Sequence, residues 1–164
     1  MRLRAFGFGG LLLAAASVAS SLVHPWGNVR GVAPGGPIFD GSAVPGDVRT
    51  LLEKKCADCH SNQTRWPVYS RLAPGSWLME RDVKAGRSAA NFSLWAGMSA
   101  GDRIDMLARI SAQVRSGEMP PKPYAMVHAA FLSDRDKQQI ALWARAERKR
   151  IKAENTQQKE SENK

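Results

Sequence analysis

Apolar side chains recur at helical spacing along most of the chain, and no segment alternates in the period-two pattern of a strand. Val48 and Leu52 follow Pro45, whose missing N–H suits the first turn of a helix. A short helix is expected over residues 75–85. The pattern therefore predicts an all-α protein with long loops.

The two clearest helices lie in the second half of the chain, and each begins with a capping signal. Ser99 and Asp102 have the spacing of a capping box, with Asp in place of the usual Glu. Gly117 suits the C-terminal cap of this helix, and Ser133 with Asp136 opens the next one. The expected inner faces are Ile104, Leu107, Ile110 and Val114 in the first helix, and Ile140, Leu142, Trp143 and Ala146 in the second.

Residues 1–25 have the layout of a secretory signal peptide, with a basic start and small residues near the end of an uncharged stretch. That stretch, residues 5–23, is also just long enough to span a bilayer, and Trp26 could lie at the membrane interface. Cleavage and retention as an N-terminal membrane anchor therefore both stay open. Either outcome exports the rest of the chain. We expect a periplasmic protein that is soluble after cleavage or anchored in the inner membrane.

Composition divides the rest of the chain into three parts. Residues 26–44 are rich in Gly and Pro and are expected to form a flexible linker. Residues 45–152 carry the helical patterns and are expected to form one folded domain. Residues 153–164 are almost entirely polar, which predicts a disordered tail.

The chain is basic, with a formal net charge of +9. The last twenty residues hold seven Lys or Arg against four Glu, so part of the excess belongs to the tail. No nucleic-acid motif accompanies the charge, and we expect no nucleic-acid partner. A basic surface favours a protein partner whose docking face is acidic.

One short motif carries candidate chemistry: Cys56-Ala57-Asp58-Cys59-His60, of the C-x-x-C-H type that attaches c-type haem. Two thiols on one helical turn lie on the same side, so each can form a thioether with a different vinyl group of one porphyrin. His60 can then point its imidazole at the iron. The chain has two cysteines in total. We therefore expect one covalently attached haem c, with His60 as an axial ligand of its iron.

Other uses of a cysteine pair fit the sequence less well. An exported chain can form an ordinary disulfide, but the histidine directly after the second cysteine favours haem. A redox-active pair is typical of a thioredoxin-like βαβ pattern, which is absent from the sequence. A structural zinc site needs further ligands, and His24 and His128 do not have finger spacing.

A second axial ligand is expected in an electron carrier, and methionine raises the reduction potential. Met119 is the preferred candidate, because Pro120 and Pro121 predict a stiffened loop that can place its thioether over the haem. Met126, His128 and an open position remain alternatives. Met79 and Met106 fall in expected helices, where core packing is the usual role of methionine.

Polar partners for the cofactor are expected near the motif. The loop with Pro67 and Pro74 could supply the carbonyl that orients the ring of His60. The haem propionates need donors, and the candidates are Arg65, Trp66, Tyr69, Trp77 and Arg87. Core packing of the aromatic rings and solvation of the arginines are the alternatives.

Four segments form a characteristic set: CADCHSNQTRWPVYSRLAPGS from Cys56 with the following Trp, then residues 86–87, residues 91–95, and Met-Pro-Pro-Lys-Pro-Tyr from Met119. Together they resemble the small bacterial haem-binding domain family of c-type cytochrome-like proteins. The resemblance covers about residues 45–146. It departs at Val68, where a second aromatic is expected, at Gly75, where a branched apolar residue is usual, and at residues 88–90, where bulkier side chains are expected. It implies a cytochrome c-like helical domain around one covalent haem. It also implies that Cys56 and Cys59 attach the haem, with His60 as proximal and Met119 as distal ligand.

Three functions are compatible with such a site. Electron transfer is preferred, because a His/Met site has no residue set for chemistry, and we therefore expect no enzymatic activity. A haem-based sensor or accessory module would use a labile Met119. A peroxidase would need an open iron face and a base, for which His128 is the candidate.

Overall fold

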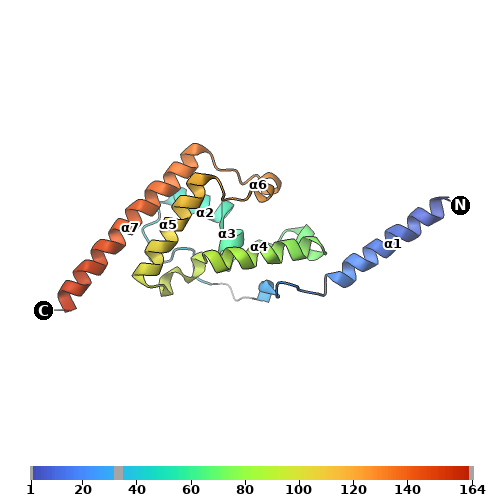
Figure 1. Cartoon of the computed structure of the whole chain (residues 1–164), viewed down its shortest axis with the longest axis horizontal. Helices are drawn as coiled ribbons and strands as arrows, with labels where there is room; N and C mark the ends of the chain where they lie inside the picture. Colours follow the sequence, from blue (N-terminus) through green and yellow to red (C-terminus); the bar gives the residue numbers. More distant parts are fainter. Residues whose placement is uncertain (1, 32–34, 163–164) are drawn as a thin grey trace.

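A computed structural model describes residues 2–31 and 35–162, and these residues form helices and loops without a strand (Figure 1). The all-α prediction is confirmed. The α-helices are α1 (Arg2–Ser20), α2 (Gly46–Lys55), α3 (Ala57–His60), α4 (Gly75–Ala89), α5 (Ala100–Ser116), α6 (Lys122–His128) and α7 (Asp134–Glu162). Three short 3-10 helices are η1 (Val29–Gly31), η2 (Val68–Arg71) and η3 (Phe92–Gly97).

The core lies where α5 and α7 pack side by side and the segment before α2 closes against them (Figure 1). Leu107 of α5 and Ile140 of α7 are fully buried there. Phe39 is also fully buried, and its ring centroid lies 4.6 Å from that of Phe92 and 5.1 Å from that of Trp143. Large aromatic rings thus supply much of the apolar area that a small domain needs.

The expected helix caps are present in the structure. The Ser99 hydroxyl accepts a hydrogen bond from the N–H of Asp102 at 3.1 Å and donates to its carboxylate at 2.6 Å. Gly117 ends α5 in the left-handed region at φ 75°. At the start of α7, Ser133 and Asp136 make the reciprocal pair of a capping box.

The inner face of α7 differs in part from the expected one. Ile140 and Trp143 are buried as expected, whereas Leu142 and Ala146 are exposed. At 3.6 residues a turn, the buried positions form one straight stripe that packs on α5, and Leu142 and Ala146 lie on the opposite side of the helix. The other buried positions of this stripe are Ala144, Glu147 and Ile151.

Two segments that were expected to be flexible are structured. Ile38 and Phe39 interrupt the expected linker and insert into the core, so residues 35–44 belong to the domain. At the other end, α7 continues through residues 153–162 with exposed side chains. Lys, Glu and Gln favour helix, and Arg150 ties this turn together by pairing with Glu147 and Glu154 at 2.6 Å each.

The N-terminal helix α1 projects away from the helical domain, and the residues that follow it contact α4 (Figure 1). The Trp77 indole donates to the carbonyl of Val23 at 2.9 Å, and His24 lies 2.8 Å from the buried carboxylate of Glu80. Among the residues that the structure describes, no helix combines the length and hydropathy required to cross a membrane.

Candidate cofactor site

A cavity of about 1020 Å³ opens beside α3 and α4 and is lined mainly by apolar side chains. This is the size range of pockets that enclose a large organic ligand. Five of the eight predicted cofactor-binding residues line it: Cys56, Cys59, His60, Tyr69 and Met119. The helix order brings these residues together from segments about 60 positions apart in the sequence.

The two cysteines lie on the wall of this cavity where α2 meets α3. Both are free thiols. Burial raises the pKa of each thiol to about 12, and for Cys59 the nearby carboxylate of Asp82 adds to the effect of burial. Both side chains are therefore uncharged at neutral pH, and they face an apolar space.

Helix α4 approaches α3 so closely that only glycine fits at the contact. A Cβ placed on Gly86 would lie 2.4 Å from the carbonyl oxygen of Cys59, well inside van der Waals contact. The neighbouring Arg87 donates to the carbonyl of Ser61 at 2.9 Å and to the hydroxyl of Thr64 at 3.0 Å. This Gly-Arg pair therefore fixes α4 against the C-terminal end of the motif and the residues that follow it.

The imidazole of His60 is oriented by a main-chain carbonyl. Its Nδ1 lies 2.9 Å from the oxygen of Ala90, and since a carbonyl only accepts, Nδ1 donates and Nε2 keeps its lone pair. Phe92 stacks on the ring at 5.3 Å with an interplanar angle of 15°, and burial lowers the pKa of His60. The sequence-based assignment of this carbonyl to the loop with Pro67 and Pro74 was wrong.

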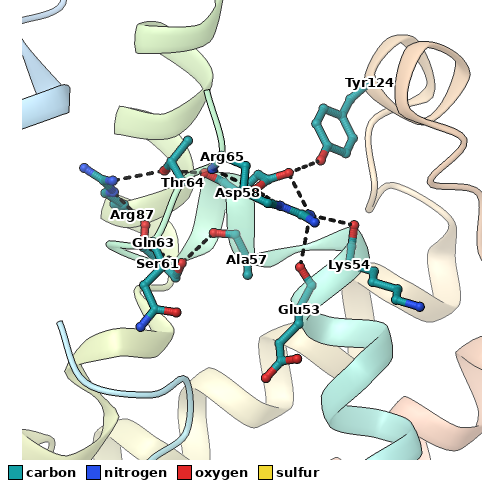
Figure 2. Close-up of polar contacts among 10 residues, drawn as sticks. All are labelled: Glu53, Lys54, Ala57, Asp58, Ser61, Gln63, Thr64, Arg65, Arg87 and Tyr124. Carbon is teal, nitrogen blue, oxygen red and sulfur yellow. Dashed lines mark hydrogen bonds and ion pairs between the residues drawn. The ribbon is translucent and has the colours of Figure 1, made fainter. Parts of the chain in front are cut away.

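Asp58, inside the motif, organises a second set of contacts (Figure 2). Its buried carboxylate accepts from Arg65 Nε at 3.0 Å and from Arg65 Nη2 at 3.1 Å. The hydroxyl of Tyr124 donates to the same carboxylate at 3.2 Å, and Thr64 donates to the main-chain carbonyl of Asp58 at 2.7 Å. These bonds tie the middle of the motif to α6.

Three of the predicted cofactor-binding side chains lie away from the cavity. Arg65 is committed to Asp58, and the guanidinium of Arg30 lies 4.0 Å from the ring centroid of Trp66. Trp77 binds the main chain beyond α1. None of these three side chains lines the cavity. Each contacts a polar or cationic partner outside it.

Two methionines line the cavity, Met119 and Met79. The N–H of Met119 donates to the carbonyl of Gln113 at 3.2 Å, which holds the loop to the end of α5. Met79 is buried in α4, and the hydroxyl of Tyr69 lies 3.4 Å from its sulfur. Met126 is 72% exposed and does not line the cavity. Met119 as the distal ligand stays a prediction, with Met79 as a second candidate.

His128 also borders the cavity. Its Nε2 is 2.7 Å from the Tyr69 hydroxyl, and its ring stacks on that of Tyr124 at 4.4 Å. Both tyrosines of the chain therefore border the cavity: Tyr69 also donates to Met79 of α4, and Tyr124 donates to Asp58 of α3.

Sequence reasoning missed the charged residues that line the cavity, which are Lys55, Arg81, Asp82 and Arg109. Arg81 pairs with Asp82 at 2.9 Å, and Lys55 donates to the carbonyl of Phe131 at 2.9 Å. Within the described part of the chain, the Arg109 side chain makes no hydrogen bond or ion pair, although its main chain is part of α5. Arg109 is adjacent in sequence to Ile110, and α5 faces the cavity through Ile110 and Val114. This position beside the apolar stripe of α5 was the sequence signal that could have identified Arg109 as a lining residue.

Comparison with known proteins agrees with this geometry. Residues 15–146 match the haem-binding domain family, and the chain belongs to that family. It is also similar to the cytochrome c peroxidase Ccp of Escherichia coli (strain K12), with 28% identity over 109 residues. The aligned region covers 64% of this chain and 23% of that protein, so the chain spans about a quarter of its relative. No solved structure matches the chain.

The residues at the cavity fit a haem. An apolar space of suitable volume meets two free thiols and an imidazole whose Nε2 is available to a metal. Arg109 offers a positive charge to a carboxylate such as a propionate. The segments that carried the family resemblance lie around this site: residues 86–87 brace the motif, and Phe92 stacks on His60.

Proposed function

We propose that this protein is a monohaem c-type cytochrome that transfers electrons in the periplasm. The observation that supports it is an apolar cavity bordered by Cys56, Cys59 and His60 and, from a distant part of the chain, by Met119. A haem bound there would supply a one-electron redox couple at its iron.

The residues of the chain have separate tasks in this proposal. Cys56 and Cys59 would hold the cofactor through thioethers, so that it would stay bound through many redox cycles. His60 would bind the iron through Nε2, and the Ala90 carbonyl keeps its ring in one tautomer and orientation. Met119 would supply a second iron ligand, which would raise the reduction potential and exclude small ligands.

The partner in this proposal is a redox protein with an acidic docking face. Cationic Lys55, Arg81 and Arg109 border the cavity, and opposite charge on a partner would steer the encounter. The basic, uncharged and small-residue order of residues 1–25 supports export, with the N-terminal segment either cleaved or kept as an anchor.

Absorption spectroscopy of protein matured by a c-type haem attachment system tests the proposal. We expect the reduced α-band of a c-type haem and, in the oxidised form, the weak charge-transfer band of a thioether–iron bond. Carbon monoxide should bind the reduced protein poorly at neutral pH. Rapid binding of carbon monoxide to most of the protein would contradict a filled sixth position and thus the electron carrier.

A peroxidase-type activity is the second candidate, and the position of His128 favours it. This histidine borders the cavity beside Tyr69, and the relative in Escherichia coli is named as a cytochrome c peroxidase. A base at an open iron face is what peroxide cleavage requires. Turnover of peroxide with a reduced electron donor, lost in His128→Ala, would favour this candidate over the electron carrier.

A further inference from the structure

The segment from Met119 to His128 is attached to the rest of the molecule at few points. Within the described residues, α6 packs over no extended surface against another helix, and it lies off the side of the α5–α7 pair (Figure 1). Ala125 is its buried residue, whereas Met126 and Val127 are 72% and 70% exposed. Individual hydrogen bonds therefore matter more for the position of this segment than for any helix of the core.

Met119 lies between two fixed points. On one side, its own N–H is bonded to the carbonyl of Gln113, at the end of α5. On the other side, after Pro120 and Pro121, Tyr124 donates to the carboxylate of Asp58 at 3.2 Å. The second point is the one that joins the methionine loop to the segment between the two cysteines.

Asp58 is a rigid acceptor for this bond (Figure 2). It is 7% exposed, and the guanidinium of Arg65 binds both of its carboxylate oxygens. The N–H of Arg65 adds a third bond at 3.1 Å, and Thr64 secures the main-chain carbonyl of Asp58. Because Asp58 lies between Cys56 and Cys59, its carboxylate has a fixed position relative to both thiols.

We infer that Tyr124 and Asp58 are positioning residues that hold the thioether of Met119 over the cavity by latching α6 to the attachment segment. The inference rests on the proposed function, because the latch has a role only if Met119 is a ligand of the haem iron. Tyr124 acts through Met119. It sets how often the methionine loop moves away from the iron, and an external ligand can bind when the loop is away.

Tyr124→Phe tests the latch with the smallest change. The variant keeps the ring, and with it the stacking on His128, and loses the hydroxyl that donates to Asp58. We expect haem attachment to be unchanged. The thioether–iron band should weaken, and imidazole should bind the oxidised protein about tenfold more tightly, the effect of one hydrogen bond to a charged group.

Thr50→Val is the matched control. It also removes one hydroxyl hydrogen bond, the one that Thr50 donates to the main-chain carbonyl of Gly46 in α2, and that bond involves neither Asp58 nor α6. Its imidazole affinity should stay within about twofold of the parent protein, as for a variant that changes stability alone.

Met79→Leu separates the two methionines. It removes the second thioether that lines the cavity and keeps an apolar side chain at this buried position of α4. If Met79→Leu loses the thioether band and Tyr124→Phe keeps it, Met79 holds the iron and the latch is wrong.

The remaining outcomes separate the latch from the proposed function. Equal spectra and imidazole affinities for Tyr124→Phe and the parent, with haem attached in both, overturn the latch and leave the cytochrome intact. Protein that carries no covalent haem on Cys56 and Cys59, as measured by intact mass, overturns the proposed function and the latch with it. A Tyr124→Phe variant with attached haem, a weaker thioether band and tighter imidazole binding supports both.

Discussion

Two regions that border the cavity are built in different ways. One is the attachment wall, made of Cys56, Cys59 and His60 with the α4 residues behind them, and the other is the Met119–His128 segment. The wall is fixed from several directions: Gly86 lets α4 touch the main chain at Cys59, and the Ala90 carbonyl orients His60. The Met119–His128 segment borders the same cavity but depends on a few hydrogen bonds and has exposed apolar side chains.

The difference indicates how the two axial positions can differ in behaviour. A ligand on the wall is preorganised before any cofactor binds, because its ring orientation is set by the protein. An iron ligand on the loosely attached segment can occupy more positions. A single hydrogen bond can therefore change the fraction of molecules in which that ligand lies at the iron. Substitutions on each side can test this contrast, beginning with the largest expected effect.

Gly86→Ala should have the largest effect, because it acts on the wall itself. The added Cβ would lie 2.4 Å from the carbonyl oxygen of Cys59, so α3 and α4 must separate. Such overpacking should reduce the free energy of unfolding by roughly 2–3 kcal/mol. It should also lower the yield of covalently attached haem. Denaturant unfolding and intact mass measure the two effects.

Gly46→Ala is the matched control for that variant. Gly46 opens α2, and a Cβ added to it would meet no heavy atom within 4 Å beyond its immediate neighbours. Its stability and haem content should equal those of the parent. Full haem attachment and parental stability in Gly86→Ala would mean that the close contact does not fix the wall.

Met119→Ala should have an intermediate effect that is confined to the axial position. We expect attached haem, loss of the thioether–iron band, a lower reduction potential and rapid carbon monoxide binding. Met79→Ala should keep the band and should destabilise the fold by about 2–5 kcal/mol, since Met79 is buried in α4. The opposite pattern, with the band lost in Met79→Ala alone, would transfer the ligand role to Met79.

Arg109→Gln should have the smallest effect. Removing a positive charge from the border of the cavity favours the oxidised, more positive iron, so the reduction potential should fall. The change should be on the order of 1 kcal/mol in the relative free energies of the two oxidation states, and salt should screen part of it. Potentiometric titration measures it. A rise in potential would contradict a location of this charge near the iron.

The sequence was sufficient for the parts of the molecule that depend on local chemistry. The caps at Ser99, Gly117 and Ser133 were predicted because each is decided within a few residues. The C-x-x-C-H motif identified the wall for the same reason. Helix α6 was missed, because its seven residues follow and include prolines and carry no apolar period. Most of its side chains are exposed, and Ala125 is its buried residue.

Contacts between distant segments could not be predicted from local pattern. The carbonyl that binds His60 comes from Ala90, 30 positions away, and any residue could supply a carbonyl. Arg65, Trp66 and Trp77 were chosen for their donor groups. In the fold, Arg65 pairs with Asp58, the ring face of Trp66 is covered by Arg30, and Trp77 donates to Val23. Gly75, one of the departures from the family pattern, is explained by the Tyr69 carbonyl, which leaves no room for a side chain.

The central claim is that Cys56 and Cys59 carry the cofactor, and intact mass under denaturing conditions tests it most directly. We expect protein matured by a haem attachment system to gain the mass of one haem. Its two thiols should then be inert to alkylation, and both properties should be lost when the two cysteines are replaced by alanine. Denatured protein that has the mass of the bare chain and two alkylatable thiols would contradict the claim.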